Sequence, residues 1–224
     1  MSSRTVRRLT VDPITTPLLT ARDAARHLRM PESTLDSWIV DSPRRPSLIH
    51  AVQPERRGWP RLPFIAVIEA YVLRSLRELG APMDQVRLAA ETVRHELGDE
   101  YALASKRIAT DGVDVFVRLA DESVLQVKHR QLGIREVLAD YLTYVTWDDD
   151  GRPVRLRLSQ YPEQAPVILD PRFGWGSPVL SESKVPVDAV LKLWRNGEPM
   201  SEVAAEYGLS TDVVEGVLRA ASAA

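Results

Sequence analysis

The sequence predicts a mainly helical protein with a β-containing middle, an α+β chain with a helix-turn-helix pattern near each end. Two short helical patterns lie near the N-terminus, at 21–29 and 31–39, and a tight turn separates them. Apolar and polar residues begin to alternate near residue 100, as they do in strands. Three helical patterns separated by glycines follow residue 186.

The length of 224 residues exceeds that of one typical small domain, so we expect several units. Composition and pattern divide the chain into a flexible basic arm at 1–16, a winged helix-turn-helix domain at 17–98, a mixed α/β middle region at 99–160 and a trihelical, helix-turn-helix-like domain at 166–224. The segment 160–166 carries two prolines among polar residues, which is typical of a linker.

The first helix is predicted from 21 to 29, behind Thr20. Asp23 stands at its third position, where a carboxylate supports an N-terminal capping box. The second helix starts at Pro31, which suits a first helical turn, and its apolar residues fall on one face: Leu35, Trp38 and Ile39. We expect Trp38 in the core because it shares this face.

Residues 43–63 break the helical pattern with prolines and arginines, and Leu48–Val52 is predicted as a short strand. We therefore expect a β-wing that carries arginines. A strong apolar pattern then predicts a helix over 64–79, ended by Gly80, and a further helix from Pro82 to Leu97.

The middle region combines strand and helix patterns. Alternation at Val113–Leu119 and Ser123–Val127 predicts a hairpin, and Leu132–Thr143 is predicted to be helical. Strands are expected at 143–147 and 153–158, joined by the strong turn sequence Asp148–Arg152.

The C-terminal part is predicted to contain helices over 187–196, 200–207 and 211–221. Gly197 and Gly208 end the first two, and Ser210 stands where a cap for the third belongs. The aromatic residues Phe173, Trp175 and Trp194 are expected in the core of this unit, with a role at a protein interface as the alternative.

Charge is distributed unevenly along the chain. The net charge is −2, but residues 1–80 hold 13 Arg against 8 Asp or Glu, a balance of +5, whereas residues 81–224 hold 16 basic and 23 acidic residues, a balance of −7. A surface for an anionic partner such as DNA is therefore expected in the N-terminal part.

The second helix of a helix-turn-helix lies in the major groove of DNA, and arginines around it contact phosphates. Because its exposed side chains here are short and partly acidic, we expect modest base reading and a large share of arginine contacts. The predicted DNA-binding residues are Arg22, Arg29, Ser33, Thr34, Ser37, Arg44, Arg45, Arg56, Arg57 and Arg61.

Other classes of chemistry find no support in the sequence. The chain has no cysteine, which excludes disulfides and thiol catalysis and permits a reducing, cytoplasmic location. The four histidines are scattered without metal-ligand spacing, and the longest apolar stretch is too short to span a membrane. We therefore expect no enzymatic activity, no metal, no cofactor and no membrane association.

Particular runs resemble known families. Leu19–Leu28, Ser33–Trp38, Arg57–Arg61 and Leu76–Gly80 resemble the MerR-like winged-helix family. The tail resembles the small trihelical domain of unknown function common in VapB-like antitoxins, on the runs Ile168–Val179, Lys184–Val187 and Gly208–Ser210. Together they are similar to VapB-like antitoxins that pair with a VapC-like ribonuclease toxin.

The resemblance implies a homodimer that binds double-stranded operator DNA of its own operon, represses transcription and neutralises the toxin. Two alternatives stay open. In the first alternative, the chain masks a nuclease without binding DNA. In the second, it is a MerR-like, ligand-responsive transcriptional regulator with an effector pocket in residues 100–160. The resemblance names no partner-binding residues.

Overall fold

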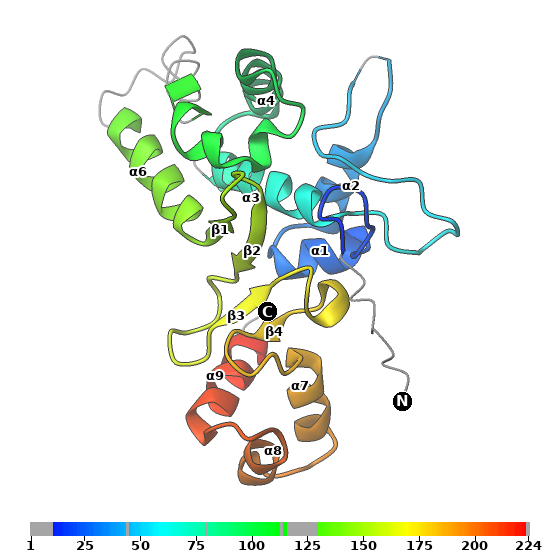
Figure 1. The fold of residues 1–224 in the computed structure, drawn as a ribbon, viewed down its shortest axis with the longest axis vertical. Coiled ribbons are helices and arrows are strands. Elements are labelled where there is room, and N and C mark those ends of the chain that lie inside the picture. The colour runs from blue at the N-terminus through cyan, green and yellow to red at the C-terminus, as the bar shows by residue number, and fades with distance from the viewer. Residues whose placement is uncertain (1–10, 44, 79, 113, 116–129, 223–224) are drawn as a thin grey trace, which may run out of the picture.

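The computed structural model describes residues 11–43, 45–78, 80–112, 114–115 and 130–222 (Figure 1). Long helices lie at one end of the molecule, three short helices at the other, and a small sheet runs between them (Figure 1). One continuous cluster of buried apolar side chains extends from Leu18 to Leu218. The α+β fold class is therefore confirmed.

The predicted helix pair is present as α1 (Ala21–His27) and α2 (Glu32–Ile39). Thr20 caps α1 as expected, because the Asp23 amide donates to Thr20 Oγ1 (3.1 Å), but the Asp23 carboxylate accepts from the Thr20 hydroxyl (2.6 Å) and not from the Thr20 amide as in a full capping box. Trp38 is buried in the core, as predicted.

Residues 11–16 differ from the flexible arm expected there. The Asp12 carboxylate accepts from the Ile14 amide and the Thr15 hydroxyl, and the Thr16 amide donates to the Asp12 carbonyl. The Ile65 amide donates to the Pro13 carbonyl (2.9 Å), which ties this turn to the long helix that begins at Phe64. Residues 1–10 lie outside the described part of the chain.

Two long helices follow, α3 (Phe64–Glu78) and α4 (Met83–Leu97). The α3 helix is buried on almost every side, and its buried residues include Glu69 and Ser75. The α4 helix ends at Gly98, whose left-handed conformation (φ 63°) a glycine adopts without strain. Both helix predictions are confirmed, except that Leu79 lies outside the described residues.

The strand predicted at Leu48–Val52 is wrong. The amides of Leu48 and Ile49 both donate to the carbonyl of Trp38 at the end of α2, at 2.8 and 3.3 Å, so they are not available to a neighbouring strand. The Val52 amide donates to the Arg61 carbonyl (2.9 Å). The segment between α2 and α3 is thus an irregular loop, and we call residues 41–61 the wing loop.

The middle region contains the short 3₁₀ helices η1 (Ala102–Ala104) and η2 (Lys106–Ala109) and the α6 helix (Arg130–Thr143). The hairpin predicted at 113–127 falls outside the described residues, apart from Asp114 and Val115, which are helical. The second hairpin is confirmed as β1 (Val145–Trp147) and β2 (Pro153–Arg157), closed by a turn at Gly151 (φ 75°).

The sheet has four antiparallel strands in the order β1-β2-β3-β4. Its second half consists of β3 (Val167–Leu169) and β4 (Val179–Leu180), with the 3₁₀ turn η3 (Gly174–Gly176) between them. Because β3 pairs with β2, the segment 160–166 is a connection within one sheet, and the sheet crosses the expected domain boundary.

The C-terminal helices are α7 (Val187–Arg195), α8 (Met200–Tyr207) and α9 (Thr211–Ser222), close to the predicted bounds. The Val213 amide donates to Ser210 Oγ (3.3 Å), which confirms the cap. The core position expected for Trp175 and Trp194 is wrong, since both side chains are exposed, and Phe173 is half-buried. None of the described helices has the length and apolar character of a membrane span.

Candidate nucleic-acid interface

The α1–α2 pair has the geometry of a helix-turn-helix. Ala24 and Ala25 on α1 are fully buried. Their small side chains allow the two helices to approach closely. The chain reverses at Leu28–Pro31, where Arg29 adopts a left-handed conformation (φ 50°) and the Met30 amide donates to the Ala25 carbonyl (3.0 Å). The reversal directs α2 across α1 and exposes one of its faces.

The face of α2 that points away from the core carries the predicted readers. Ser33 is exposed, whereas Thr34 and Ser37 are half-buried, and the Ser37 hydroxyl already donates to the Thr34 carbonyl (2.7 Å). Glu32 and Asp36 are exposed beside them. Ser33 is therefore the predicted hydroxyl with the most freedom to reach a base edge.

Arg22 connects the two helices at this surface. Its Nε lies 3.2 Å from Glu32 Oε2, and both side chains are exposed to solvent. An exposed ion pair of this kind contributes little to stability, so the guanidinium is available to exchange the carboxylate for a phosphate. The first turns of α1 and α2 thus share one surface.

The wing loop presents the second set of basic groups. The Arg56 guanidinium lies 5.3 Å from the centre of the Trp59 ring, and Arg45 and Arg57 are exposed. Arg61 is half-buried, and its Nε has no hydrogen-bond partner. Arg44 lies outside the described residues.

Sequence reasoning missed Trp59, which is 47% exposed. The signal was an aromatic residue among the arginines of the wing loop, a combination that can stack on sugars or bases. Residues 17–63 hold 8 Arg against 5 Asp or Glu, so this part of the chain has a balance of +3.

A buried carboxylate anchors the wing loop. Glu69 on α3 accepts hydrogen bonds from the His50 amide (2.8 Å), from His50 Nδ1 (2.8 Å) and from Arg94 Nη2 (3.0 Å). Arg94 also donates to the Leu48 carbonyl (2.6 Å), and Arg87 donates to the Pro46 carbonyl (2.7 Å). These contacts hold the start of the loop against α3 and α4 although it lacks strands.

Arg29, a predicted DNA contact, has a different place. Its Nη2 donates to the Ala220 carbonyl near the end of α9 (3.3 Å), so the structure uses this guanidinium to join α1 to the C-terminal helices. Gln160 acts in parallel, since its Nε2 donates to the His27 carbonyl at the end of α1 (3.0 Å).

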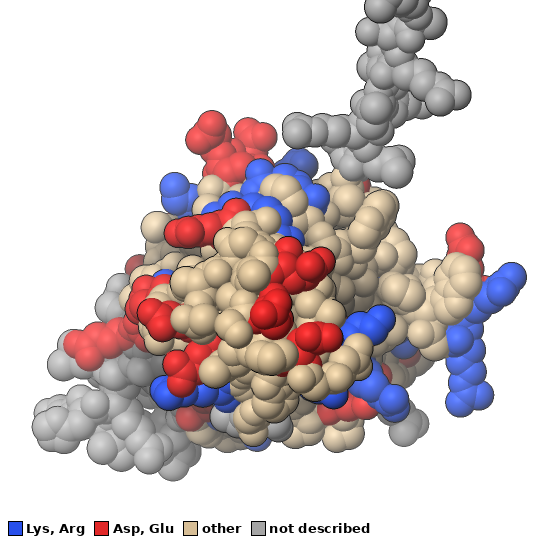
Figure 2. Space-filling view, turned by 90° about the horizontal axis from the view of Figure 1, so that it is seen from below, with Lys and Arg blue, Asp and Glu red and all other residues tan. Residues whose placement is uncertain are grey.

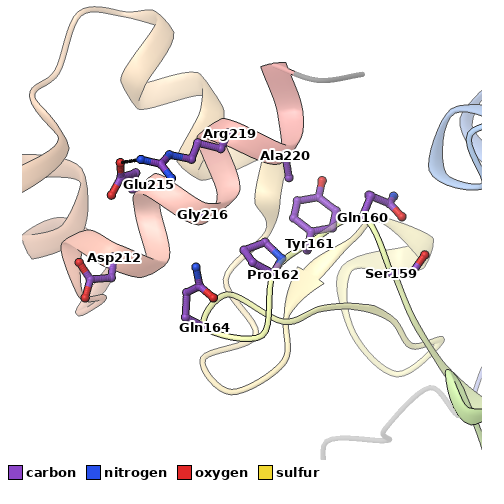
Figure 3. A pocket seen from close by; sticks show the side chains of 10 residues that line it. All are labelled: Ser159, Gln160, Tyr161, Pro162, Gln164, Asp212, Glu215, Gly216, Arg219 and Ala220. Carbon is purple, nitrogen blue, oxygen red and sulfur yellow. Dashed lines mark hydrogen bonds and ion pairs between the residues drawn. The ribbon is translucent and has the colours of Figure 1, made fainter.

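Gln160 and Ala220 also line opposite walls of a cleft of about 550 Å³ between the segment 159–164 and α9 (Figure 3). The α9 wall carries Asp212 and an Arg219–Glu215 ion pair (2.6 Å), and the other wall carries Tyr161 and Gln164 (Figure 3). Polar and apolar side chains both line the cleft, and the bond from Gln160 to the His27 carbonyl connects one of its walls to the end of α1.

The C-terminal helices present an acidic face. Residues 187–222 hold six carboxylates against three basic side chains. Seen from the end of the molecule where these helices lie, several red side chains lie among uncharged ones on the central surface, and blue ones lie mostly toward its edges (Figure 2). Such a surface repels phosphates, and this argues against the C-terminal helices as a second DNA reader.

His27 predicts a pH dependence at the contact between α1 and the C-terminal unit. Burial lowers its pKa from 6.5 to about 4, and the nearby Arg26 charge contributes to the lowering. In the unfolded chain the His27 imidazole therefore becomes protonated near pH 6.5, whereas in the folded protein it stays neutral down to about pH 4. Stability is present above pH 6.5 and is lost as the pH falls toward 4.

We expect the free energy of unfolding to fall by about 2 kcal/mol through this group between pH 7 and pH 5. Urea titrations at both pH values measure it, and His27→Gln should remove this part of the decline. His95→Gln, at an exposed position on α4, is the matched control. An unchanged pH dependence in His27→Gln contradicts the expectation.

Comparison with known proteins finds a family match for each end of the chain. Residues 17–90 match the family model described as "Putative DNA-binding HTH domain", and residues 167–219 match "Protein of unknown function (DUF433)". The whole chain is 35% identical over 228 aligned residues to the Mycobacterium tuberculosis protein named "Putative antitoxin VapB45", covering 92% of this chain and 95% of the relative. The chain belongs to the VapB45 antitoxin family.

The fold of this VapB45-family chain is similar to the X-ray crystal structure of Rv2018 from Mycobacterium tuberculosis. The TM-score is 0.76 at 33% identity, and the match covers 91% of this chain and 98% of that one. The helix-turn-helix match includes α1, α2, the wing loop and α3, so the predicted N-terminal helix-turn-helix is confirmed for the VapB45-family chain, whereas its winged form is not. Its MerR-like character stays a prediction.

Proposed function

We propose that this chain is a DNA-binding antitoxin, which represses its own operon and neutralises a VapC-like ribonuclease toxin in the cytoplasm. The observation that carries the proposal is an exposed α2 face beside a basic wing loop, in a chain related over almost its whole length to an antitoxin-named protein. The exposed α2 face and the basic wing loop support operator binding, and the relationship to an antitoxin-named protein supports neutralisation of a toxin.

At the DNA, α2 enters the major groove with Ser33 toward the base edges. The acidic Glu32 and Asp36 on this face limit direct reading, so phosphate contacts supply most of the affinity. The proposed phosphate contacts are Arg22 on α1 and, on the wing loop, Arg44, Arg45, Arg56, Arg57 and Arg61. We propose that two protomers bind one palindromic operator, because a two-fold dimer places two reading helices one helical turn of DNA apart.

The C-terminal helices suit a protein partner rather than DNA. A ribonuclease needs a basic surface to hold the phosphates of RNA, and an acidic face complements such a surface. The excess of carboxylates in residues 187–222 therefore supports capture of the nuclease at the end of the molecule opposite the long helices. No catalytic group of this chain takes part in the proposed function.

The test is a titration of operator DNA from the chain's own upstream region, with random DNA as competitor, from low to physiological salt. The double variant Arg56→Ala, Arg57→Ala should bind the operator at least tenfold more weakly at low salt. The slope of log affinity against log salt should become shallower by about 2, because two phosphate contacts are lost. Fluorescence anisotropy of labelled DNA measures both quantities.

The matched control is Arg195→Ala, Arg219→Ala, which removes two exposed arginines from the C-terminal helices and should leave affinity unchanged. The wing-loop variant should still co-purify with the nuclease from the neighbouring gene and inhibit it. If the wild-type protein binds operator and random DNA equally, or neither, operator repression is wrong and the protein only masks its partner.

A further inference from the structure

The turn between β3 and β4 holds a tryptophan in a strained and exposed position. Three successive residues have left-handed backbones: Gly174 (φ 65°), Trp175 (φ 50°) and Gly176 (φ 87°). The Trp175 side chain is 68% exposed, the highest value among the exposed large apolar residues of the described chain. A left-handed conformation costs a non-glycine residue about 1–2 kcal/mol.

Close packing on both sides fixes this conformation. A Cβ at Gly174 would lie 2.8 Å from the Val179 side chain, and one at Gly176 would lie 2.9 Å from Leu18 Cβ and 3.1 Å from the Leu18 carbonyl oxygen. The turn is therefore held firmly while the indole projects into solvent. Folding gains little from an exposed ring on a strained backbone, so the position favours contact with another molecule.

The position of the turn indicates which molecule. Leu18, against which Gly176 packs, comes two residues before Thr20, the cap of α1. Arg22, two residues beyond the cap, pairs with Glu32 at the start of α2. In Figure 1 the yellow turn lies directly beside α1. The turn that carries Trp175 thus packs against the residues just before α1, the helix that presents Arg22.

The charges around the turn suit an anionic partner. Arg172 and Lys184 both lie against the ring of Phe173, at 5.7 and 5.1 Å from its centre. Arg172 is exposed even though its guanidinium also binds the buried Asp170 carboxylate (2.6 Å).

We propose that Trp175 contacts the DNA backbone and extends the helix-turn-helix interface into the C-terminal family domain. The indole Nε1–H donates to a phosphate oxygen next to the one that Arg22 binds, and the ring packs against the adjoining sugar. The contact adds affinity without reading sequence. The inference rests on the proposed operator binding and names one more group that supplies it.

The experiment measures operator affinity for three variants at this position. Trp175→Gly accepts the left-handed backbone without strain, so its stability should equal or exceed that of the wild type while its affinity for DNA falls about tenfold. Trp175→Ala should lose affinity to the same extent, and Trp175→Phe, which keeps a ring but no donor, should fall between. Trp194→Ala changes a tryptophan that is 43% exposed in α7 and should bind like the wild type.

Specific and random DNA should lose affinity in the same ratio, because a backbone contact carries no sequence information. Wild-type affinity in all three Trp175 variants overturns the proposal, as does loss of nuclease capture with unchanged DNA binding, which makes the indole a protein contact. If the wild-type protein binds no operator, the proposed repression is wrong. This outcome is distinguishable from failure of the Trp175 proposal, because it is seen with the wild-type protein before any variant is compared.

Discussion

Glu69→Ala is expected to lower the free energy of unfolding by about 3 kcal/mol and to release the wing loop. The Glu69 carboxylate is completely buried and is the common acceptor for the His50 amide, the His50 ring and the Arg94 guanidinium. Removing one member of a buried charged network leaves its partners unsatisfied, which costs about 3–5 kcal/mol. Since His50 and Arg94 keep some access to water, the lower end applies.

Urea unfolding at pH 7 measures this loss. Operator affinity should also fall at temperatures where the variant is still folded, because the start of the wing loop is no longer held against α3 and α4. Glu78→Ala is the matched control, since Glu78 is exposed and pairs only with Arg74 one turn away, a contact typically below 1 kcal/mol. Equal stabilities for the two variants would mean that the buried network does not support the helix-turn-helix.

Trp38→Ala is the second large expected effect, a loss of about 3–5 kcal/mol. The Trp38 side chain is 1% exposed, and its carbonyl accepts from Leu48 and Ile49, so α2 and the wing loop meet at this residue. Truncating a buried tryptophan removes its transfer energy and leaves a cavity. Loss of cooperative unfolding in thermal scans, together with loss of operator binding, is the expected result.

Trp59→Ala separates burial from the loss of a tryptophan as such. Trp59 is exposed on the wing loop, so its removal should change the unfolding free energy by less than about 0.5 kcal/mol. Trp38→Phe should cost less than alanine, because it refills most of the space and removes an indole nitrogen that has no partner. A Trp38→Ala protein as stable as the wild type would overturn the assignment of this residue to the core.

Local signals predicted much of this fold. Thr20 with Asp23, Ser210, and the glycines that end helices act within a few residues, so their caps and bounds follow from the sequence. The turn at Gly151 is of the same kind. The helical spacing of Leu35, Trp38 and Ile39 also identified the core face of α2, including the burial of Trp38.

Non-local contacts account for what the sequence did not predict. The amides of Leu48 and Ile49 donate to the Trp38 carbonyl, ten and eleven residues earlier in the chain, which no strand pattern reveals. The bond from Arg29 to the Ala220 carbonyl joins residues at opposite ends of the chain, and no local pattern predicts it. Trp175 lies next to Gly176, which packs against the distant Leu18, and aromatic content alone favoured the wrong location for this side chain.

The pairing of β2 with β3 has a consequence for how such chains diversify. The family domain at 167–219 begins at β3, so its boundary in sequence passes through the middle of a hydrogen-bonded sheet. A recombination event that exchanged this domain between relatives would have to preserve the register of Leu156 with Leu169 and the close packing of Gly176 against Leu18. The two halves should therefore be inherited together, with changes of partner arising by substitution on exposed faces rather than by exchange of domains.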